Sequence, residues 1–590
     1  MCGLVIRMRM HLARKCASCP EAVKVEMGAE IGRKHKASSS DGLAHPAMKA
    51  RIEKDHDQGI AKVQTSSRDL VKAHKAQAAT DTDDLTNLPL TSTPLTTKVV
   101  LDNKKDLDSC VARAIFRAGL PVAAVEHWAF IKMLKRMNSA YDPPRVSVLA
   151  ASALDLEYAE VQSRLQAEMR DSSLVSIGVE SWAVSQKCIL VSCLINRPKP
   201  AVFSIESTGV MPPTPAVLVK TIHNTITQVG TGRVSVIVTD TTDGMKQASL
   251  MLQDQYSGIT ILPSCAYVMN QMMTEILGMR TIARTLDICK KLAGFFATDH
   301  LARGSFLRVS EHMHFVDEIA PMGDPDDSSP IGLLECLFKV ERGRHILDIL
   351  LAENGTMNKL IAQAKEEIIT LAFWKDVSLF TELLGPFLEI LKMFEADSPL
   401  LSTFYHQFTL LWAHLNKFEE LASKLQPIVT GYWETIQHPA IYAAYLLDPR
   451  FPLSNLTGEA TSEALAYIKR TSNVEAYGTI VDELTRFTAR TGLFADDAIW
   501  ESAQKCSPLH WWKGFIGSSC PNLQRVAMLT LSFPISSGLP KRKREIFKRI
   551  LLMNAQYMSE AQSSKAAVVC LNSTLVSSVE DNSVSSETHV

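Results

Sequence analysis

Hydrophobic residues between positions 174 and 277 follow two alternating patterns. Short runs rich in Val, Ile and Leu are typical of strands, and longer stretches with apolar residues three and four positions apart are typical of helices. The run at 233–239 is rich in Val and Ile, as expected of a strand buried on both faces. Together these patterns predict strands over 174–180, 187–195, 201–206, 233–239 and 258–262, and helices over 217–229, 244–255 and 266–277.

This element order, β-β-β-α-β-α-β-α, predicts an α/β fold with a ribonuclease-H-like mixed sheet over residues 171–280. The short gaps between the first three runs favour an antiparallel meander, which βα units then follow. Residues 281–507 have helical periodicity almost throughout, so we expect a large all-α insertion after the last strand.

The flanking segments differ in composition and periodicity. Residues 1–36 are rich in basic side chains, and residues 37–100 are polar and aperiodic, which predicts a disordered linker. Helical spacing returns over 101–170 and again over 508–560. Residues 561–590, rich in Ser and Val, are predicted to be a disordered tail.

The composition excludes several classes of protein. The chain has 590 residues, 46% of them hydrophobic, and 62 basic against 63 acidic side chains, so it is neither globally disordered nor uniformly basic. Any DNA contact must therefore come from local patches. No apolar stretch approaches the ~20 residues of a membrane helix, so we expect no membrane partner. The 12 cysteines lack a framework spacing, which favours a reducing compartment.

Two acidic residues stand where catalytic carboxylates would be needed. Glu180 ends the first predicted strand, and Asp240 directly follows the fourth. In ribonuclease-H-like enzymes several carboxylates hold two Mg²⁺ ions for phosphoryl transfer. The alternative is that each acid only caps a strand or forms a turn.

At these residues the chain resembles the hAT transposase superfamily, and more closely its degenerate relatives with a BED-type zinc finger. The resemblance covers about 100–560, and the helices near 114–141 resemble the family's DNA-associated region. The motifs that carry the resemblance are Gly178-Val179-Glu180-Ser181-Trp182, Val238-Thr239-Asp240-Thr241-Thr242-Asp243-Gly244-Met245, Ser264-Cys265-Ala266-Tyr267-Val268-Met269-Asn270, Ala443-Ala444-Tyr445-Leu446-Leu447-Asp448-Pro449-Arg450-Phe451, and Trp511-Trp512 with Phe533-Pro534-Ile535-Ser536-Ser537-Gly538.

Departures from the family pattern predict a degenerate catalytic site. The first acid of the family is Asp, and here it is Glu180. The third family acid aligns with Lys541, and Glu545, one helical turn away, is a possible substitute. A cation at a metal-ligand position repels Mg²⁺, so we expect no transposase activity and expect Lys541 to project towards the two acids. Mg²⁺ binding is expected only if the alternative, an active hAT transposase, holds.

The N-terminal segment resembles the second half of a BED finger. Cys2, His11 and Cys16 (or Cys19) supply three of the four ligands that tetrahedral Zn²⁺ needs, so zinc binding should be weak or lost. The alternative is a disordered basic arm, in which Arg7 and Arg9 are candidate DNA contacts.

The densest basic cluster is Lys541-Arg542-Lys543-Arg544. It predicts a nuclear-localisation signal or a phosphate-contacting face, and the alternative is a solvated helix face. Residues 508–560 resemble the family's dimerisation region. Their apolar residues predict either a homodimer surface or packing within the chain; these residues are Trp511, Trp512, Leu523, Val526, Leu529 and Leu531.

The expected function is therefore that of a nuclear, hAT-derived DNA-binding protein that self-associates and lacks transposase activity. The alternatives are an active transposase and a relic without function.

Overall fold

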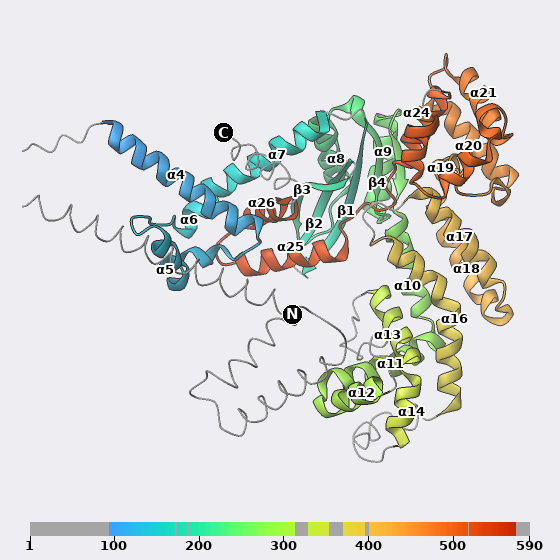
Figure 1. Ribbon diagram of the computed structural model, residues 1–590, viewed down its shortest axis with the longest axis horizontal. Coiled ribbons are helices and arrows are strands. Elements are labelled where there is room, and N and C mark those ends of the chain that lie inside the picture. The colour runs from blue at the N-terminus through green and yellow to red at the C-terminus, as the bar shows by residue number, and fades with distance from the viewer. Residues whose placement is uncertain are drawn as a thin grey trace, which may run out of the picture. The chain divides into compact units, whose positions relative to one another are not determined.

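Five strands form one mixed sheet in the computed structural model of the chain (Figure 1). They are β1 Val175–Ser185, β2 Cys188–Arg197, β3 Lys199–Gly209, β4 Val234–Thr239 and β5 Thr260–Pro263. Their order is β3-β2-β1-β4-β5, with β2 antiparallel to its neighbours β1 and β3, and with β1, β4 and β5 parallel. The protein is thus a mixed α/β protein, and helices make up most of the rest.

The structure describes residues 94–170, 174–185, 188–197, 199–312, 329–352, 370–395, 400–516 and 519–573. Nearly all of them belong to the second of two units into which the chain divides, Lys98–Val590. The predicted finger and almost the whole predicted linker lie outside the described residues, as do positions 574–590 of the predicted tail.

Alternation along β1 assigns its side chains to the two faces of the sheet. Ile177 and Val179 pack on one face with α8 (Pro215–Val229) and α9 (Asp243–Gln255). Trp182 lies on the opposite face, where its ring meets that of Phe547 edge-on at 5.4 Å. Because successive residues of a strand point to opposite sides, Gly178 and Glu180 share the Trp182 face.

That second face is covered by helices from both ends of the described chain. Buried residues of β1, β2 and β3 form one cluster with the C-terminal helices α25 (Lys541–Asn554) and α26 (Glu560–Leu571). The N-terminal helices join the same cluster (Figure 1); they are α4 Pro94–Arg117, α5 Trp128–Met137, α6 Val146–Val148 and α7 Leu154–Arg170.

Helix α26 corrects the predicted tail, since residues 561–571 are helical. A capping box starts the helix, in which Ser559 and Gln562 exchange hydrogen bonds with each other's backbone. Just after it, the Asn572 carboxamide accepts from Val202 N at 3.0 Å and donates to Val202 O at 2.7 Å, on the outer edge of β3. The buried face of α26 is built largely from Ser, Ala and Val, so its sequence shows no strong apolar stripe.

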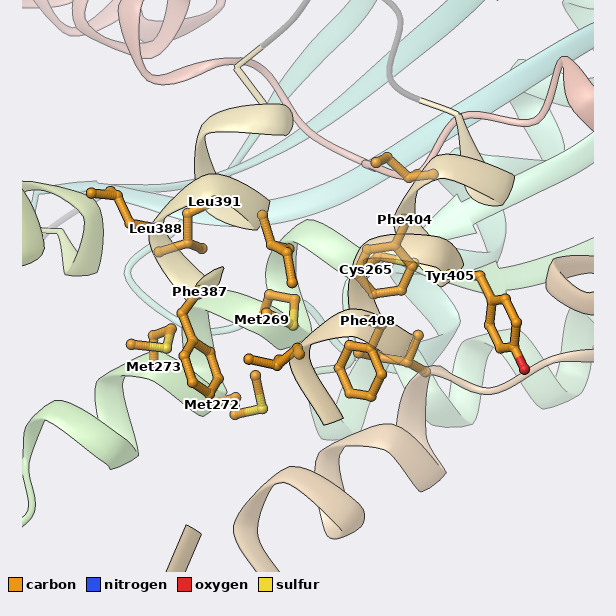
Figure 2. Close-up of a cluster of buried hydrophobic side chains, with 14 of the residues drawn as sticks. Cys265, Met269, Met272, Met273, Phe387, Leu388, Leu391, Phe404, Tyr405 and Phe408 are labelled. Carbon is orange, nitrogen blue, oxygen red and sulfur yellow. The ribbon is translucent and has the colours of Figure 1, made fainter. Parts of the chain in front are cut away.

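The region between β5 and α25 is largely helical in the stretches that the structure describes. Its largest cluster joins α10 (Cys265–Leu277) to α16 (Leu371–Met393) and α17 (Leu401–Leu415), with three methionines of α10 facing phenylalanines of the other two (Figure 2). The remaining helices are α11 Arg280–Thr298, α12 His300–His312, α13 Pro330–Arg342, α14 Arg344–Ala352, α18 Glu419–Ile436, α19 Pro439–Leu446, α20 Gly458–Thr471, α21 Tyr477–Thr488, α22 Asp497–Ala503, α23 Pro508–Trp511 and α24 Pro521–Leu531. Within the described residues, none of the helices has both the length and the apolar character to cross a membrane.

Candidate functional site

Glu180 and Asp240 come together because β1 and β4 are parallel neighbours. Val179 pairs with Thr239 in the register, so Asp240 continues β4 beside Glu180. The Asp240 N–H donates to Val179 O at 3.2 Å, and the Ser181 N–H donates to Asp240 Oδ2 at 2.7 Å. Asp240 therefore makes hydrogen bonds with Val179 and Ser181, the residues before and after Glu180.

The Asp240 carboxylate is fully used by hydrogen bonds within the protein. Its Oδ2 accepts from the Ser181 N–H and, at 3.0 Å, from the Ser181 hydroxyl. Its Oδ1 accepts from the Thr242 N–H at 3.0 Å and from the Thr242 hydroxyl at 2.7 Å. Asp240 is only 1% exposed, and two oxygens offer about four acceptor positions, so a metal ion would have to displace existing bonds.

The Glu180 carboxylate is buried against an arginine. The side chain is 5% exposed, and Arg544 Nη2 lies 2.7 Å from Oε1 and 2.9 Å from Oε2, donating its hydrogen bond to Oε2. Burial raises the pKa of Glu180 to about 7. The charge of Arg544 opposes this rise and that of Asp240 adds to it. Arg544 therefore occupies the side of Glu180 that a divalent cation would need.

A C-terminal segment, residues 535–539, packs against β1 beside Glu180. Ser537 N donates to Ser264 Oγ at 3.2 Å, and Ala266 N donates to Ile535 O at 3.3 Å, which ties the segment to the start of α10. A Cβ at Gly178 would come within 2.7 Å of Ser537 O, so glycine permits the close approach.

The same segment covers the Glu180 carboxylate from its other side. A Cβ at Gly538 would overlap that carboxylate, and a backbone hydrogen bond from Leu539 opposes the rise in the pKa of Glu180. Glu180 is thus packed between the glycine of this segment and the arginine of α25.

Tyr267, at the start of α10, lies near enough to both acids for their charges to affect its ionisation. Burial raises its pKa, and the negative charges of Asp240 and Glu180 raise it further. A phenol with a raised pKa stays neutral, so it adds no ligand charge to the site.

The basic cluster takes a different arrangement from the predicted one. The cation that contacts Glu180 is Arg544, one turn along α25, whereas Lys541 is exposed and donates to Ser329 Oγ at 3.4 Å. The expectation that Lys541 projects towards the acids is therefore wrong, and Arg544 is engaged inside the protein. Glu545 is exposed and pairs with Lys548 at 2.9 Å.

These contacts do not fit a two-metal site. No group of three or more His, Cys, Asp or Glu side chains that could hold a metal ion occurs among the residues the structure describes. One acid is neutralised by Arg544 and the other is saturated with hydrogen bonds. Cys2, His11, Cys16, Arg7 and Arg9 lie outside the described residues.

Sequence reasoning missed three partners of the acids. Thr242 lies two positions after Asp240, and hydroxyls so placed commonly bond a neighbouring carboxylate, so this signal was available. Ser181 follows Glu180 in the sequence but bonds Asp240, 59 positions away, so no local signal pointed to it. Arg544 is 364 positions from Glu180, and nothing in the local pattern of α25 singles it out from Lys541.

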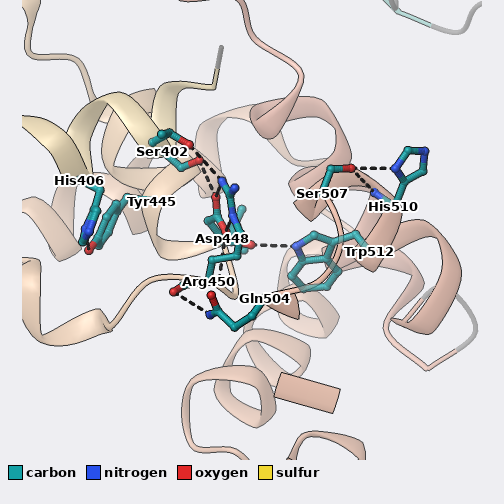
Figure 3. A network of polar contacts seen from close by, with 11 residues as sticks. Ser402, His406, Tyr445, Asp448, Arg450, Gln504, Ser507, His510 and Trp512 are labelled. Atoms are coloured by element: carbon teal, nitrogen blue, oxygen red, sulfur yellow. Dashed lines mark hydrogen bonds and ion pairs between the residues drawn. The ribbon is translucent and has the colours of Figure 1, made fainter. Parts of the chain in front are cut away.

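The segment Asp448-Pro449-Arg450-Phe451 forms a second polar centre (Figure 3). Asp448 is buried, accepts from Ser402 Oγ at 2.6 Å and pairs with Arg450 at 2.7 Å. The Trp512 indole N–H donates to Leu447 O at 2.8 Å. This centre ties the Trp512 segment to the helical region by hydrogen bonds.

The apolar residues predicted for a dimer surface are mostly buried within the chain. Trp511, Trp512, Leu523 and Leu531 have no exposed area, and Val526 is 7% exposed. Packing within the chain therefore accounts for these five residues, which cannot form a contact surface in this conformation, whereas Leu529 is half-buried.

Two family models match the chain. Residues 144–292 match a domain of unknown function, DUF659, which occurs in hAT-family transposase-like proteins. Residues 488–575 match the hAT family C-terminal dimerisation region. The sequence matches no curated protein. Together the two matches support a relation to hAT transposase-like proteins. Self-association is supported by the dimerisation region.

Proposed function

We propose that this chain is a nuclear DNA-binding protein derived from a hAT transposase, with a ribonuclease-H-like core that no longer cleaves or joins DNA. The core assignment is supported by the strand order β3-β2-β1-β4-β5, in which an antiparallel meander is extended by two parallel strands. The position of both acids next to each other on β1 and after β4 agrees with it.

The observation that carries the loss of catalysis is the contact between Arg544 and Glu180. Two divalent ions a few Å apart repel strongly and need several free carboxylates around them. The Arg544 guanidinium keeps its positive charge at any working pH, so a metal ion would have to displace it from Glu180. A metal ion approaching this carboxylate would meet a fixed positive charge, and no third free acid compensates within the described residues.

Duplex DNA would bind the exposed N-terminal turn of α25. Four basic residues begin this helix and its first turn contains no acid, although the helix dipole already makes that end positive. Basic side chains at the positive end of a helix are repelled by the helix dipole in the free protein. The same charges and the free backbone N–H groups bind a phosphate favourably. Arg544 is engaged by Glu180, so Lys541 and Arg542, both exposed, would provide the contacts.

Three further parts of the proposal follow from the sequence. The same basic cluster would serve as the nuclear-localisation signal. Cys2, His11 and Cys16 would form at most a weak Zn²⁺ site. The region 488–575 would mediate homodimerisation, through surfaces other than the buried tryptophans.

The test is a strand-cleavage assay. The full chain is incubated with inverted-repeat duplex DNA and Mn²⁺, and the products are separated on a denaturing gel. We expect binding without nicked, hairpin or joined products. Products that disappear in an Asp240→Ala variant would instead identify an active transposase and overturn the proposal.

A further inference from the structure

Helix α5 presents an exposed aromatic and basic stripe. Trp128, Lys132 and Arg136 lie four residues apart, so they follow one line along the helix for about 12 Å. All three are exposed, and Trp128 is 70% exposed, which is unusual for so large an apolar ring. Packing in the protein core therefore does not explain why these three side chains follow one line along α5.

The stripe is held in place from its opposite side. Leu134 is buried beneath the helix, and the His127 ring caps its first turn by accepting from Ala129 N at 3.3 Å. The His127 and Trp128 rings lie 5.8 Å apart, with an angle of 33° between their planes. Two neighbouring exposed rings thus sit at the start of the basic line.

The basic side chains along and beside the stripe differ in their partners. Lys135, beside the line, pairs with Asp142 at 2.6 Å. Lys132 and Arg136 have no ion pair among the described residues. Lys132 is in the middle of the helix, so a favourable contact with the helix C-terminus does not explain its charge.

We propose that this stripe binds single-stranded DNA. Exposed aromatic rings stack on unpaired bases whatever their identity, and cations next to them contact the phosphates. A duplex keeps its bases stacked on one another, so it would use Lys132 and Arg136 but not Trp128. We choose DNA rather than RNA because this inference rests on the proposed function, in which α25 binds a DNA duplex.

The experiment measures the binding of fluorescent oligonucleotides to the full chain by polarisation. The probes are a 20-nucleotide dT strand, a U strand of equal length and a 20-base-pair duplex. The variants are Trp128→Ala, Trp128→Phe and Lys132→Ala/Arg136→Ala. Leu301→Ala and Lys424→Ala/Lys505→Ala serve as matched controls, because these side chains are also exposed but lie outside α5. Thermal melts verify that each variant folds.

We expect Trp128→Ala to weaken dT binding about tenfold, since stacking contributes a factor of roughly 5 to 150 per base. Trp128→Phe should retain most of the affinity. The double basic variant should lower the salt dependence by about 0.7 for each lost phosphate contact. Duplex binding should change less than twofold in Trp128→Ala.

If Trp128→Ala and Lys132→Ala/Arg136→Ala bind the dT strand as tightly as the wild type, the proposal is overturned. The stripe would then be a candidate binding surface for a protein partner. A Trp128-dependent preference for the U strand overturns the assignment to DNA. A Lys541→Ala/Arg542→Ala variant separates this result from the proposed function. If that variant binds duplex normally, the role of α25 fails while the single-strand result stands.

Discussion

Replacing Glu180 with glutamine should remove a pH-dependent loss of stability from this protein. The carboxyl group is buried and its pKa is raised from the usual 4.5 to about 7. The folded state therefore holds this proton at a pH where the unfolded chain has released it. As pH rises from about 4.5 through about 7, the free energy of unfolding falls.

The size of the effect follows from the pKa. A rise from 4.5 to about 7 corresponds to about 3 kcal/mol, at about 1.4 kcal/mol for each tenfold change in proton affinity. Glutamine keeps the shape and the acceptor oxygen of the protonated acid. Arg544 loses its anion but remains 37% exposed, so water can solvate part of its charge and the gain at high pH should be nearer 1–2 kcal/mol.

The assay is urea unfolding at pH 4.5 and pH 8.0, followed by circular dichroism. Relative to the wild type, Glu180→Gln should gain stability at pH 8.0 and change little at pH 4.5, where most of the effect of the raised pKa has not yet been lost. Glu545→Gln is the matched control, because Glu545 is an exposed acid on α25 that also pairs with a cation, and its profile should follow the wild type. A Glu180→Gln variant that is less stable than the wild type at pH 8.0 would show that the Arg544 pair outweighs burial and would refute the reasoning.

Two further substitutions test the packing around the site and the sheet edge. Gly538→Ala should destabilise the protein by about 1–3 kcal/mol, because the new methyl overlaps a carboxylate held by Arg544, whereas Gly304→Ala, with open space around it, should be neutral or slightly stabilising in the same thermal melts. Asn572→Ala should cost about 1–3 kcal/mol by leaving the Val202 peptide unpaired on β3, and faster hydrogen exchange confined to that strand would locate the loss; unchanged exchange there would exclude this role.

Local patterns predicted the sheet because each strand carries its own signal. The Val and Ile residues of β4 are buried on both faces, and the antiparallel meander follows from the short gaps between the first three strands. The sequence did not predict α26, which begins at Glu560. The buried face of this helix is made largely of small residues, and the Ser559 capping box is the main local signal for its start.

The partners of the acids were harder to predict for a physical reason. Hydrophobic periodicity shows which side of α25 is buried, and Phe547 and Ile550 define that side. It does not show which of four consecutive basic residues will reach an acid on another element. That choice depends on how residues 535–539 place the start of α25, through contacts with Gly178 and Ser264 that are distant in sequence.

The central claim is that Arg544 and the hydrogen bonds of Asp240 leave no place for catalytic metal ions. Mn²⁺ binding to the full chain, measured by calorimetry at pH 8.0 where Glu180 is mostly ionised, tests it most directly. The account predicts the same heat of titration for the wild type and for Asp240→Asn. A Mn²⁺ site in the wild type that is lost in Asp240→Asn would contradict it.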